Sequence, residues 1–242
     1  MKWRRPKSDN QVITFKSLND HTWNVKPRPI PASTVLPDWW KKIPHYSDGR
    51  KSMELDPAPA VTVKRCMSAL DALGSGYVVP LWADIQVTYV KGDGTYMKWA
   101  TSTPVASTWN TTQVAGYKLP EGFGLPVFKL HHEWLIETPP GWSCLFTQPF
   151  GYPDLPFRVI PGIVDTDKLK TDINTPIVFK EGWEGILEKG TPMFQITPIK
   201  RANWTSEFVQ GDEKQFFYDS ETLRSKIVSY YGRYLRVPKI FK

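Results

Sequence analysis

The sequence predicts an all-β protein with a jelly-roll or β-barrel core, preceded by an extended arm and followed by a helix. Between residues 61 and 201, short runs rich in Val, Ile, Thr and aromatic residues alternate with turn signals such as KGDG (91–94) and PEGFG (120–124). Short strands separated by such turns are typical of barrels and sandwiches. The 22 prolines and 16 glycines also interrupt the chain too often for long helices.

Residues 1–60 predict an extended, proline-rich arm. Prolines at positions 27, 29, 31, 37 and 44 forbid a long helix and favour extended or polyproline geometry. Residues 37–42 (PDWWKK) predict one short helical turn. Its two tryptophans pack on the main domain in one interpretation and form a ligand platform in the other.

Residues 61–205 predict the β domain. The runs with strand character are residues 60–66, 76–90, 94–101, 125–138, 143–149, 157–167, 173–180 and 193–201. The eleven tryptophans of the chain either fill the core of this domain or line a platform for sugars or bases.

Residues 206–242 predict a helical tail, with the helix over 219–237. Asp219 or Ser220 supplies the N-cap, and Leu223, Ile227 and Tyr234 recur at helical spacing. This apolar stripe predicts a helix docked on the rest of the chain. The arginines beside it leave a basic, aromatic recognition helix as the alternative.

Composition limits the classes of protein. No apolar run approaches the roughly 18–20 residues that a membrane helix needs, so we expect no membrane partner. The basic first residues lack the apolar segment of a secretory signal. Cys66 and Cys144 are far apart and lack metal or redox spacing, which predicts two free, buried thiols in a reducing cytoplasm.

The net charge of +7 is concentrated toward the two ends of the chain. These basic ends are either solvated tails or contacts for nucleic acid or an acidic protein surface. The basic residues on which the second interpretation depends are Lys2, Arg4, Arg5, Lys7, Arg224, Arg233 and Arg236.

Four segments occur in a fixed order: GSGYVV (74–79), PPGWSCLF (139–146), PGIVDTDKLKTDI (161–173) and KGTPMFQI (189–196). In this order they resemble the motifs of the trimeric dUTPase and dCTP deaminase family, which are A-G-Y-D-L, R-S-G-L or R-S-S-L, G-V-I-D-x-x-Y-x-G and K-G-D-R-I-A-Q. The resemblance covers about residues 71–201. It implies a jelly roll that trimerises, with sites at the subunit interfaces.

The resemblance also implies roles for individual residues. Asp165 matches the aspartate that activates water, Ser143 a phosphate-contacting serine, and Gln195 the glutamine of the last motif. If a nucleotide site is retained, Ser143, Gln195, Lys168 and Tyr77 bind the nucleotide and Mg²⁺ is the cofactor. If it is not, we expect neither a catalytic residue nor a cofactor.

The departures from the family motifs favour the second case. Trp142 replaces the arginine before the serine, Lys168 replaces the tyrosine that packs under the deoxyribose, and Val78 or Val79 replaces an aspartate. No Gly-rich lid follows Arg201, and the glutamate of the deaminases is absent. Because one lost donor to a phosphoryl transition state costs on the order of 10²–10³ in rate, these departures predict little dUTPase activity.

The order TPPGWSCLF, GIVDTD and GTPxxQI, with DWWKKIP before it, is also similar to a group of uncharacterised proteins of tailed bacteriophages. We therefore expect a non-enzymatic assembly or virion protein, in the host cytoplasm or in the virion. Its expected partners are further copies of itself, as a trimer, and other phage proteins. A nucleotide-binding or nucleotide-hydrolysing enzyme is the alternative.

The stretch His131-His132-Glu133 raises the question of a metal site. On a strand, neighbouring side chains point to opposite faces, so His131 and Glu133 share a face. No third ligand is visible in the sequence, and no metal site is predicted.

Overall fold

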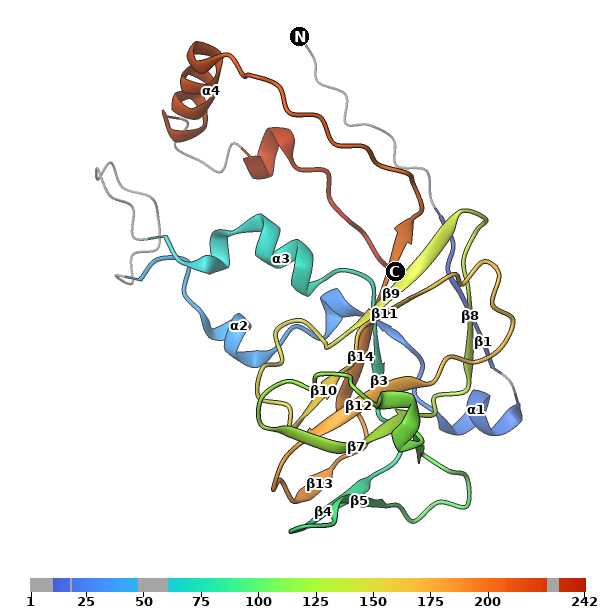
Figure 1. Cartoon of the computed structure of the whole chain (residues 1–242). Coiled ribbons are helices and arrows are strands. Elements are labelled where there is room, and N and C mark those ends of the chain that lie inside the picture. Colours follow the sequence, from blue (N-terminus) through green and yellow to red (C-terminus); the bar gives the residue numbers. More distant parts are fainter. Residues whose placement is uncertain (1–10, 18, 48–60, 226–230) are drawn as a thin grey trace. The chain divides into compact units, whose positions relative to one another are not determined.

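Antiparallel β-sheets dominate the computed structural model, which describes residues 11–17, 19–47, 61–225 and 231–242 (Figure 1). The chain divides into two compact units. The first, which we call the β unit, comprises residues 10–37, 73–201 and 241–242. The second, which we call the terminal unit, comprises residues 1–9, 38–72 and 202–240.

The strands of the described residues are short, as the density of turn residues predicts. They are β1 (Thr14–Ser17), β2 (Ile30–Pro31), β3 (Tyr77–Pro80), β4 (Ile85–Val90), β5 (Gly94–Lys98), β6 (Ala106–Thr108), β7 (Phe123–Leu130), β8 (Trp134–Glu137), β9 (Trp142–Thr147), β10 (Phe157–Val159), β11 (Gly162–Val164), β12 (Thr175–Lys180), β13 (Gly185–Leu187) and β14 (Pro192–Lys200).

These strands form four antiparallel sheets. Their orders are β11-β9-β14-β3-β2, β10-β12-β7-β6, β13-β4-β5 and β1-β8. The prediction of a mostly β protein is confirmed. No closed barrel is found among the described residues, because each of these sheet orders is open.

The helices are few and short. They are α1 (Asp20–Val25), α2 (Asp38–Lys42), α3 (Met67–Leu73) and α4 (Glu213–Ser225), with 3₁₀ turns η1 (Ala32–Thr34), η2 (Val63–Arg65) and η3 (Thr111–Val114) and a π turn η4 (Tyr231–Leu235). Helix α2 confirms the helical turn predicted at residues 37–42. Within the terminal unit, Lys64 donates to the carbonyl of the buried Trp40 at 2.7 Å.

The core of the β unit lies between the sheets. Period-2 alternation directs side chains such as Ile85, Phe157, Ile177 and Ile196 inward, and all four are fully buried. Phe179 contacts Phe128 and Phe157 edge to face and stacks on Trp183. Each buried side chain of this size contributes about 1.5–3 kcal/mol, so this core accounts for most of the stability of the unit.

Residues 11–37 differ from the irregular arm that their prolines predict. Strand β1 pairs with β8, and β2 adds to the edge of the five-stranded sheet beside β3. Pro31 ends β2 on that edge, where a missing N–H costs no ladder bond. The prolines therefore keep these segments short but do not exclude them from the sheets.

Two strand predictions need correction. Residues 60–66 form no strand: Thr62 Oγ1 accepts from the Lys64 amide at 3.2 Å and caps the 3₁₀ turn η2. The run 125–138 is two strands, because the chain leaves the sheet at residues 131–133, where Glu133 has a positive φ of 55°. In both runs the strand-like composition gave no indication of the local feature that prevents or ends the strand, which is the Thr62 cap in the first and the turn at residues 131–133 in the second.

The predicted start of the C-terminal helix is wrong by six residues. Helix α4 begins at Glu213, and Asp212 Oδ1 accepts from the amides of Lys214 at 2.9 Å and Gln215 at 3.2 Å. Asp219, the expected cap, lies inside the helix and accepts from the Gln215 side chain. The capping geometry of Asp212 decided the start rather than the apolar stripe.

At Gly76, just before β3, the backbone lies very close to that of β14. Its φ is +68°, and a Cβ added there meets the Ile196 carbonyl oxygen at 1.9 Å. We expect Gly76→Ala to lower the free energy of unfolding by more than about 3 kcal/mol, because backbone must move. Gly92→Ala is the control, since its φ is +85° but nothing lies within 4 Å, and it should cost only about 1–2 kcal/mol. Urea denaturation measures both, and equal costs would contradict the close approach.

Candidate functional site

The register of three neighbouring strands gathers the residues of the candidate site. Strand β9 pairs with β11 on one side and β14 on the other, with Val164 opposite Cys144 and Ile199 opposite Ser143. Asp165 follows the end of β11 and Arg201 follows the end of β14. Both therefore lie beside Ser143, at the start of β9.

Ser143 and Asp165, which the resemblance singled out, are in direct contact. The Ser143 hydroxyl donates to Asp165 Oδ1 at 2.7 Å, and Arg201 Nη1 lies 3.2 Å from the same carboxylate oxygen. Ser143 is buried, whereas the Asp165 side chain is 48% exposed. Hydrogen bonding from Ser143 and the charge of Arg201 lower the pKa of Asp165.

Asp167 holds the guanidinium of Arg201 from the other side. Arg201 Nη1 donates to Asp167 Oδ1 at 2.8 Å, and Nη2 pairs with Oδ2. Asp167 also accepts from the Gly141 amide at 2.9 Å. These hydrogen bonds hold the pKa of Asp167 well below its usual range. A bidentate pair of this kind fixes the geometry as well as the charge of the arginine.

The remaining donors of the site are bound to backbone and side-chain oxygens within the site itself. Arg201 Nη1 donates to the Trp142 carbonyl at 2.8 Å and to Ser143 Oγ at 3.0 Å. Next to them, the hydroxyls of Thr138 and Thr166 lie 2.7 Å apart. Burial raises the pKa of the adjacent Cys144 thiol to about 11, which leaves it unreactive at neutral pH.

The arrangement limits the chemistry of this cluster. No imidazole among the described residues forms a hydrogen bond with Ser143, whose hydroxyl donates to a carboxylate that is already paired with an arginine. Within the cluster, the Asp165 side chain has the most access to solvent, at 48% exposed against 31% for Arg201. The cluster can therefore accept a hydrogen bond from water, and its guanidinium is already paired with two carboxylates, while the exposed Lys168 beside it is the nearby cation.

Gln195 is placed elsewhere and has a structural role. It is 1% exposed, accepts from the Phe150 amide at 2.9 Å and donates to the Ser75 carbonyl. In the ladder it lies opposite Thr147, four residues along β9 from Ser143. Gln195 thus ties two loops to β14 rather than facing the Ser143 cluster.

Of the two remaining predicted residues, Lys168 lies beside the acidic residues of the cluster, whereas Tyr77 packs near the end of the chain. Lys168 is exposed, and its charge contributes to lowering the pKa values of Asp165 and Asp167. Tyr77 is buried in β3, contacts Phe15 and Phe241 edge to face, and donates to the Lys242 carbonyl at 3.1 Å. Its phenol is therefore part of the packing around the end of the chain.

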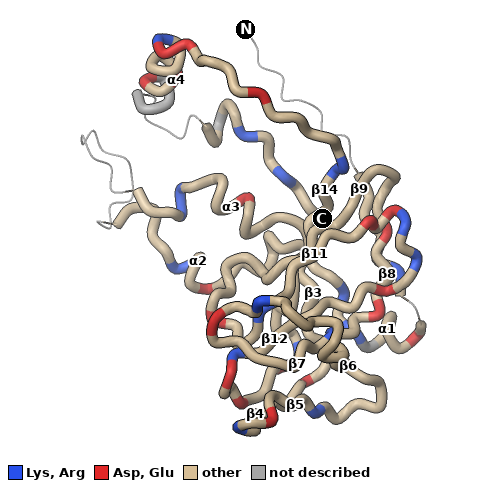
Figure 2. The backbone as a smooth tube through the Cα atoms, viewed as in Figure 1, with Lys and Arg blue, Asp and Glu red and all other residues tan. Residues whose placement is uncertain are grey.

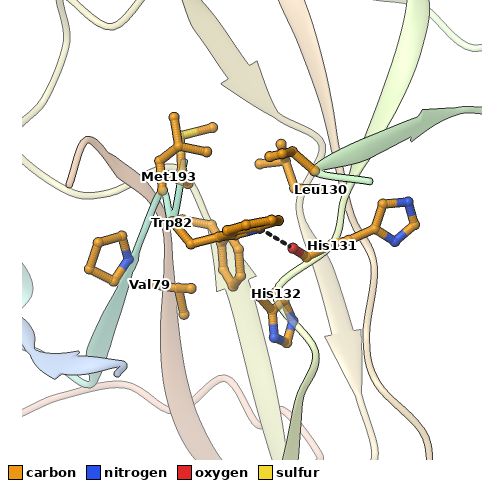
Figure 3. A pocket seen from close by; sticks show the side chains of 10 residues that line it. Val79, Trp82, Leu130, His131, His132 and Met193 are labelled. Carbon is orange, nitrogen blue, oxygen red and sulfur yellow. Dashed lines mark hydrogen bonds between the residues drawn. The ribbon is translucent and has the colours of Figure 1, made fainter. Parts of the chain in front are cut away.

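The stretch His131-His132-Glu133 is held by its own contacts (Figure 3). Trp82 Nε1 donates to the His131 carbonyl at 3.0 Å, and the two imidazoles point in different directions. Burial lowers the pKa of His132 to about 4, so this ring is neutral. Glu133 pairs at 2.9 Å with Lys26, whose buried ammonium also lies over the Trp82 ring.

Among the described residues, no group of three His, Cys, Asp or Glu side chains is placed to hold a metal ion. The cluster offers only Asp165 and Asp167, both paired with Arg201. An Mg²⁺ ion at this place would have to displace that arginine. The residues present therefore do not fit the cofactor that a retained nucleotide site implies.

The basic ends can be followed only in part. Lys2, Arg4, Arg5 and Lys7, and the side chains of Arg224 and Arg233, lie outside the described residues. Arg236 is engaged within the terminal unit, with Nε 3.1 Å from both carboxylate oxygens of Asp71. Over the described β unit, acidic and basic residues are interspersed (Figure 2).

Sequence reasoning missed two members of the cluster, Arg201 and Asp167. The motif GIVDTD contains both aspartates, but they come together at Arg201 through the turn that follows β11, where the Lys168 and Leu169 amides donate to the Asp165 carbonyl. Arg201 ends the run 193–201, which was expected to be a strand. Its partner strand is not readable from one sequence. Of the two predicted buried thiols, Cys144 is buried and Cys66 is exposed, and both are free.

These features define a mostly β protein with a closed Ser-Asp-Arg-Asp cluster at one end of its largest sheet. No model of a known protein family matches the chain, and no curated protein matches it. No helix among the described residues is long and apolar enough to cross a membrane.

The cluster should make stability depend on pH through Asp167. Because the pKa of Asp167 is lower in the folded chain than the usual value of about 3.9, its ionised form stabilises the fold above that value. This contribution is lost as the pH falls through the folded-state pKa. We expect wild type to be more stable than Asp167→Asn by a constant amount from about pH 8 to pH 5, and the difference to shrink below about pH 4.

Urea midpoints at a series of pH values measure this difference. The exposed Asp154 provides the matched control, as Asp154→Asn removes one carboxylate without touching Arg201. A gap between wild type and Asp167→Asn that stays constant down to pH 3 would contradict the role of the ionised carboxylate.

Proposed function

We propose that the protein is a non-enzymatic assembly or virion protein of a phage, built on a dUTPase-like jelly roll whose nucleotide site has become a scaffold. The observation that carries this proposal is the state of Ser143. Ser143 is 1% exposed and its hydroxyl donates to Asp165, so the hydroxyl is not available to a phosphate oxygen.

The charges of the cluster support the same conclusion. Phosphate sites present free donors and positive charge, most effectively as a bidentate arginine. Here the guanidinium of Arg201 faces two carboxylates, so Arg201, Asp165 and Asp167 together carry one net negative charge. An incoming triphosphate would be repelled and would have to break the Asp167 pair.

The oligomeric state, the partners and the location that we propose are those expected from the sequence. The β unit forms a homo-oligomer, a trimer in the resemblance, and the terminal segments reach neighbouring copies or other virion proteins. The protein acts in the host cytoplasm during assembly or within the particle. The basic ends give it the option of nucleic acid as a further partner.

One observation favours a second function, nucleotide binding or hydrolysis. Asp165 is exposed, ionised and close to the positive charge of Lys168, as a water-activating carboxylate would be. In this alternative, a nucleotide would open the cluster and recruit Arg201 in place of the arginine that Trp142 replaces.

A nucleotide panel separates the two functions. With Mg²⁺ and each deoxynucleoside triphosphate at up to millimolar concentration, we expect no hydrolysis and no thermal shift. A ligand at one hundred times its Kd would stabilise the fold by about 2.7 kcal/mol, which is readily detected. A shift that Asp165→Ala abolishes and Asp154→Asn leaves intact would replace the structural proposal with the alternative.

Particle composition tests the structural proposal directly. We expect mass spectrometry of gradient-purified particles to detect the chain at a fixed ratio to the major capsid protein, or to detect it in assembly intermediates from lysates. Absence from both fractions, while the chain is abundant in the same lysate, would contradict the proposal.

A further inference from the structure

The β unit carries an open groove between two sheet edges. It has a volume of about 390 Å³, and its lining includes Tyr96, Met97, Trp99, Ser107, Thr108 and Phe128. We call it the β5–β6 groove. Its volume lies in the range of sites that hold a ligand or several side chains.

Unpaired strand edges border this groove. Strand β5 is the last of the order β13-β4-β5, and β6 is the last of the order β10-β12-β7-β6. Each therefore has one ladder partner and a free edge, which presents backbone N–H and C=O groups to an added strand. Main-chain hydrogen bonds at such an edge, with pockets for alternate side chains, are a common way to bind an extended segment.

The chain also carries an extended segment that has no cover. Residues 201–212 contain no helix, strand or turn, and the exposed fractions are 89% for Trp204, 97% for Phe208 and 74% for Val209. In an extended chain, Trp204 and Phe208 point to the same side. We call residues 202–213 the apolar segment. Exposed apolar surface of this kind marks an interaction site.

The charges of the groove and the segment are complementary. The segment reads ANWTSEFVQGDE, and its charged residues are all acidic, although the chain as a whole carries a net charge of +7. Two lysines neighbour lining residues of the groove: Lys98 follows Met97 in β5, and Lys129, whose ammonium lies over the Trp109 ring, is the cross-strand partner of Ser107. The nearby Asp93 already accepts a hydrogen bond from Tyr96.

Trp204 lies too close to Arg201 along the chain to reach the groove of its own copy. The sheet β13-β4-β5 adjoins the Pro192 end of β14, because β13 precedes that end and Pro192 pairs with Pro80. Figure 1 shows β5 and the Arg201 end of β14 at opposite ends of the β unit. Nine residues of strand span about 30 Å, whereas Trp204 lies three residues beyond Arg201, a reach of about 10 Å.

We propose that the apolar segment of one copy binds as an added strand in the β5–β6 groove of a second copy. Trp204 and Phe208 fill the groove, and the acidic residues face Lys98 and Lys129. This contact rests on the proposed function, since it supplies the self-assembly that the function needs. Because segment and groove are different surfaces, the contact is head-to-tail, which is the kind of contact that builds a ring such as a trimer when its rotation closes.

Peptide binding to the full chain tests the contact. The receptor is the double variant Trp204→Ala, Phe208→Ala, so that its own segments do not compete. The probe is a fluorescein-labelled peptide of residues 202–213, and the matched peptide carries alanine at both aromatic positions. We expect the probe to bind, the matched peptide and a Thr108→Glu receptor to lose at least about tenfold in affinity, and salt to weaken binding.

Ile163→Glu, at the exposed edge strand β11, is the control for adding a negative charge to a sheet edge. It should leave the affinity for the peptide unchanged. Failure of the peptide to bind, or equal loss in Thr108→Glu and Ile163→Glu, would overturn the proposed contact.

Sedimentation of the chain itself provides the second arm. We expect wild type to assemble, and both the double variant and Thr108→Glu to sediment as monomers. A mixture of these two variants should give a one-to-one dimer, because one supplies a groove and the other a segment. Monomeric wild type, or assembly that survives both variants, would overturn the contact. In the second case the structural function stands, since only the nucleotide and particle experiments decide it.

Discussion

The register of β9 against its two neighbours is the constraint on which the rest of the β unit depends. It directs Phe146 and Ile196 into the core and, from the same strands, places Ser143 next to Asp165 and Arg201. A shift of one residue would exchange the two faces of every strand involved. The buried Gln195 and the close approach at Gly76 both sit on this sheet and leave little room for such a shift. Core and cluster are thus specified together.

The cluster at the end of this sheet is saturated with its own interactions. The oxygens of Asp165 and Asp167 that face Arg201 each accept a hydrogen bond or form an ion pair, and Ser143, which donates to Asp165, is buried. A ligand-binding site usually has donors or charges that lack partners in the free protein. In this cluster the donors and charges are paired with residues at the ends of three strands. The same atoms that a phosphate would need therefore hold β9, β11 and β14 in place.

Much of the architecture was readable from the sequence, because it depends on local patterns. Turn signals such as KGDG located the hairpin between β4 and β5, and the motif order brought Ser143 and Asp165 into one site. Arg201 could not be assigned, since its role depends on which strand lies beside β14, and strand order is a property of the whole fold. The role of Lys26 could not be predicted either, because the sequence around it does not show that its ammonium is buried against Glu133, a residue distant in the sequence. Local sequence patterns thus predict secondary-structure elements, whereas the pairing of distant strands decides which residues meet in a site.

The pairing of β1 with β8 and of β3 with β14 has a consequence for how the protein is made. Each pair joins segments that are separated by more than a hundred residues, so neither can form until most of the chain has been synthesised. Loop closure over such distances makes folding slow. At typical rates of translation, β3 leaves the ribosome on the order of ten seconds before β14. During that interval the apolar face of β3 lacks its partner β14, and the central sheet is completed only when β14 has been synthesised.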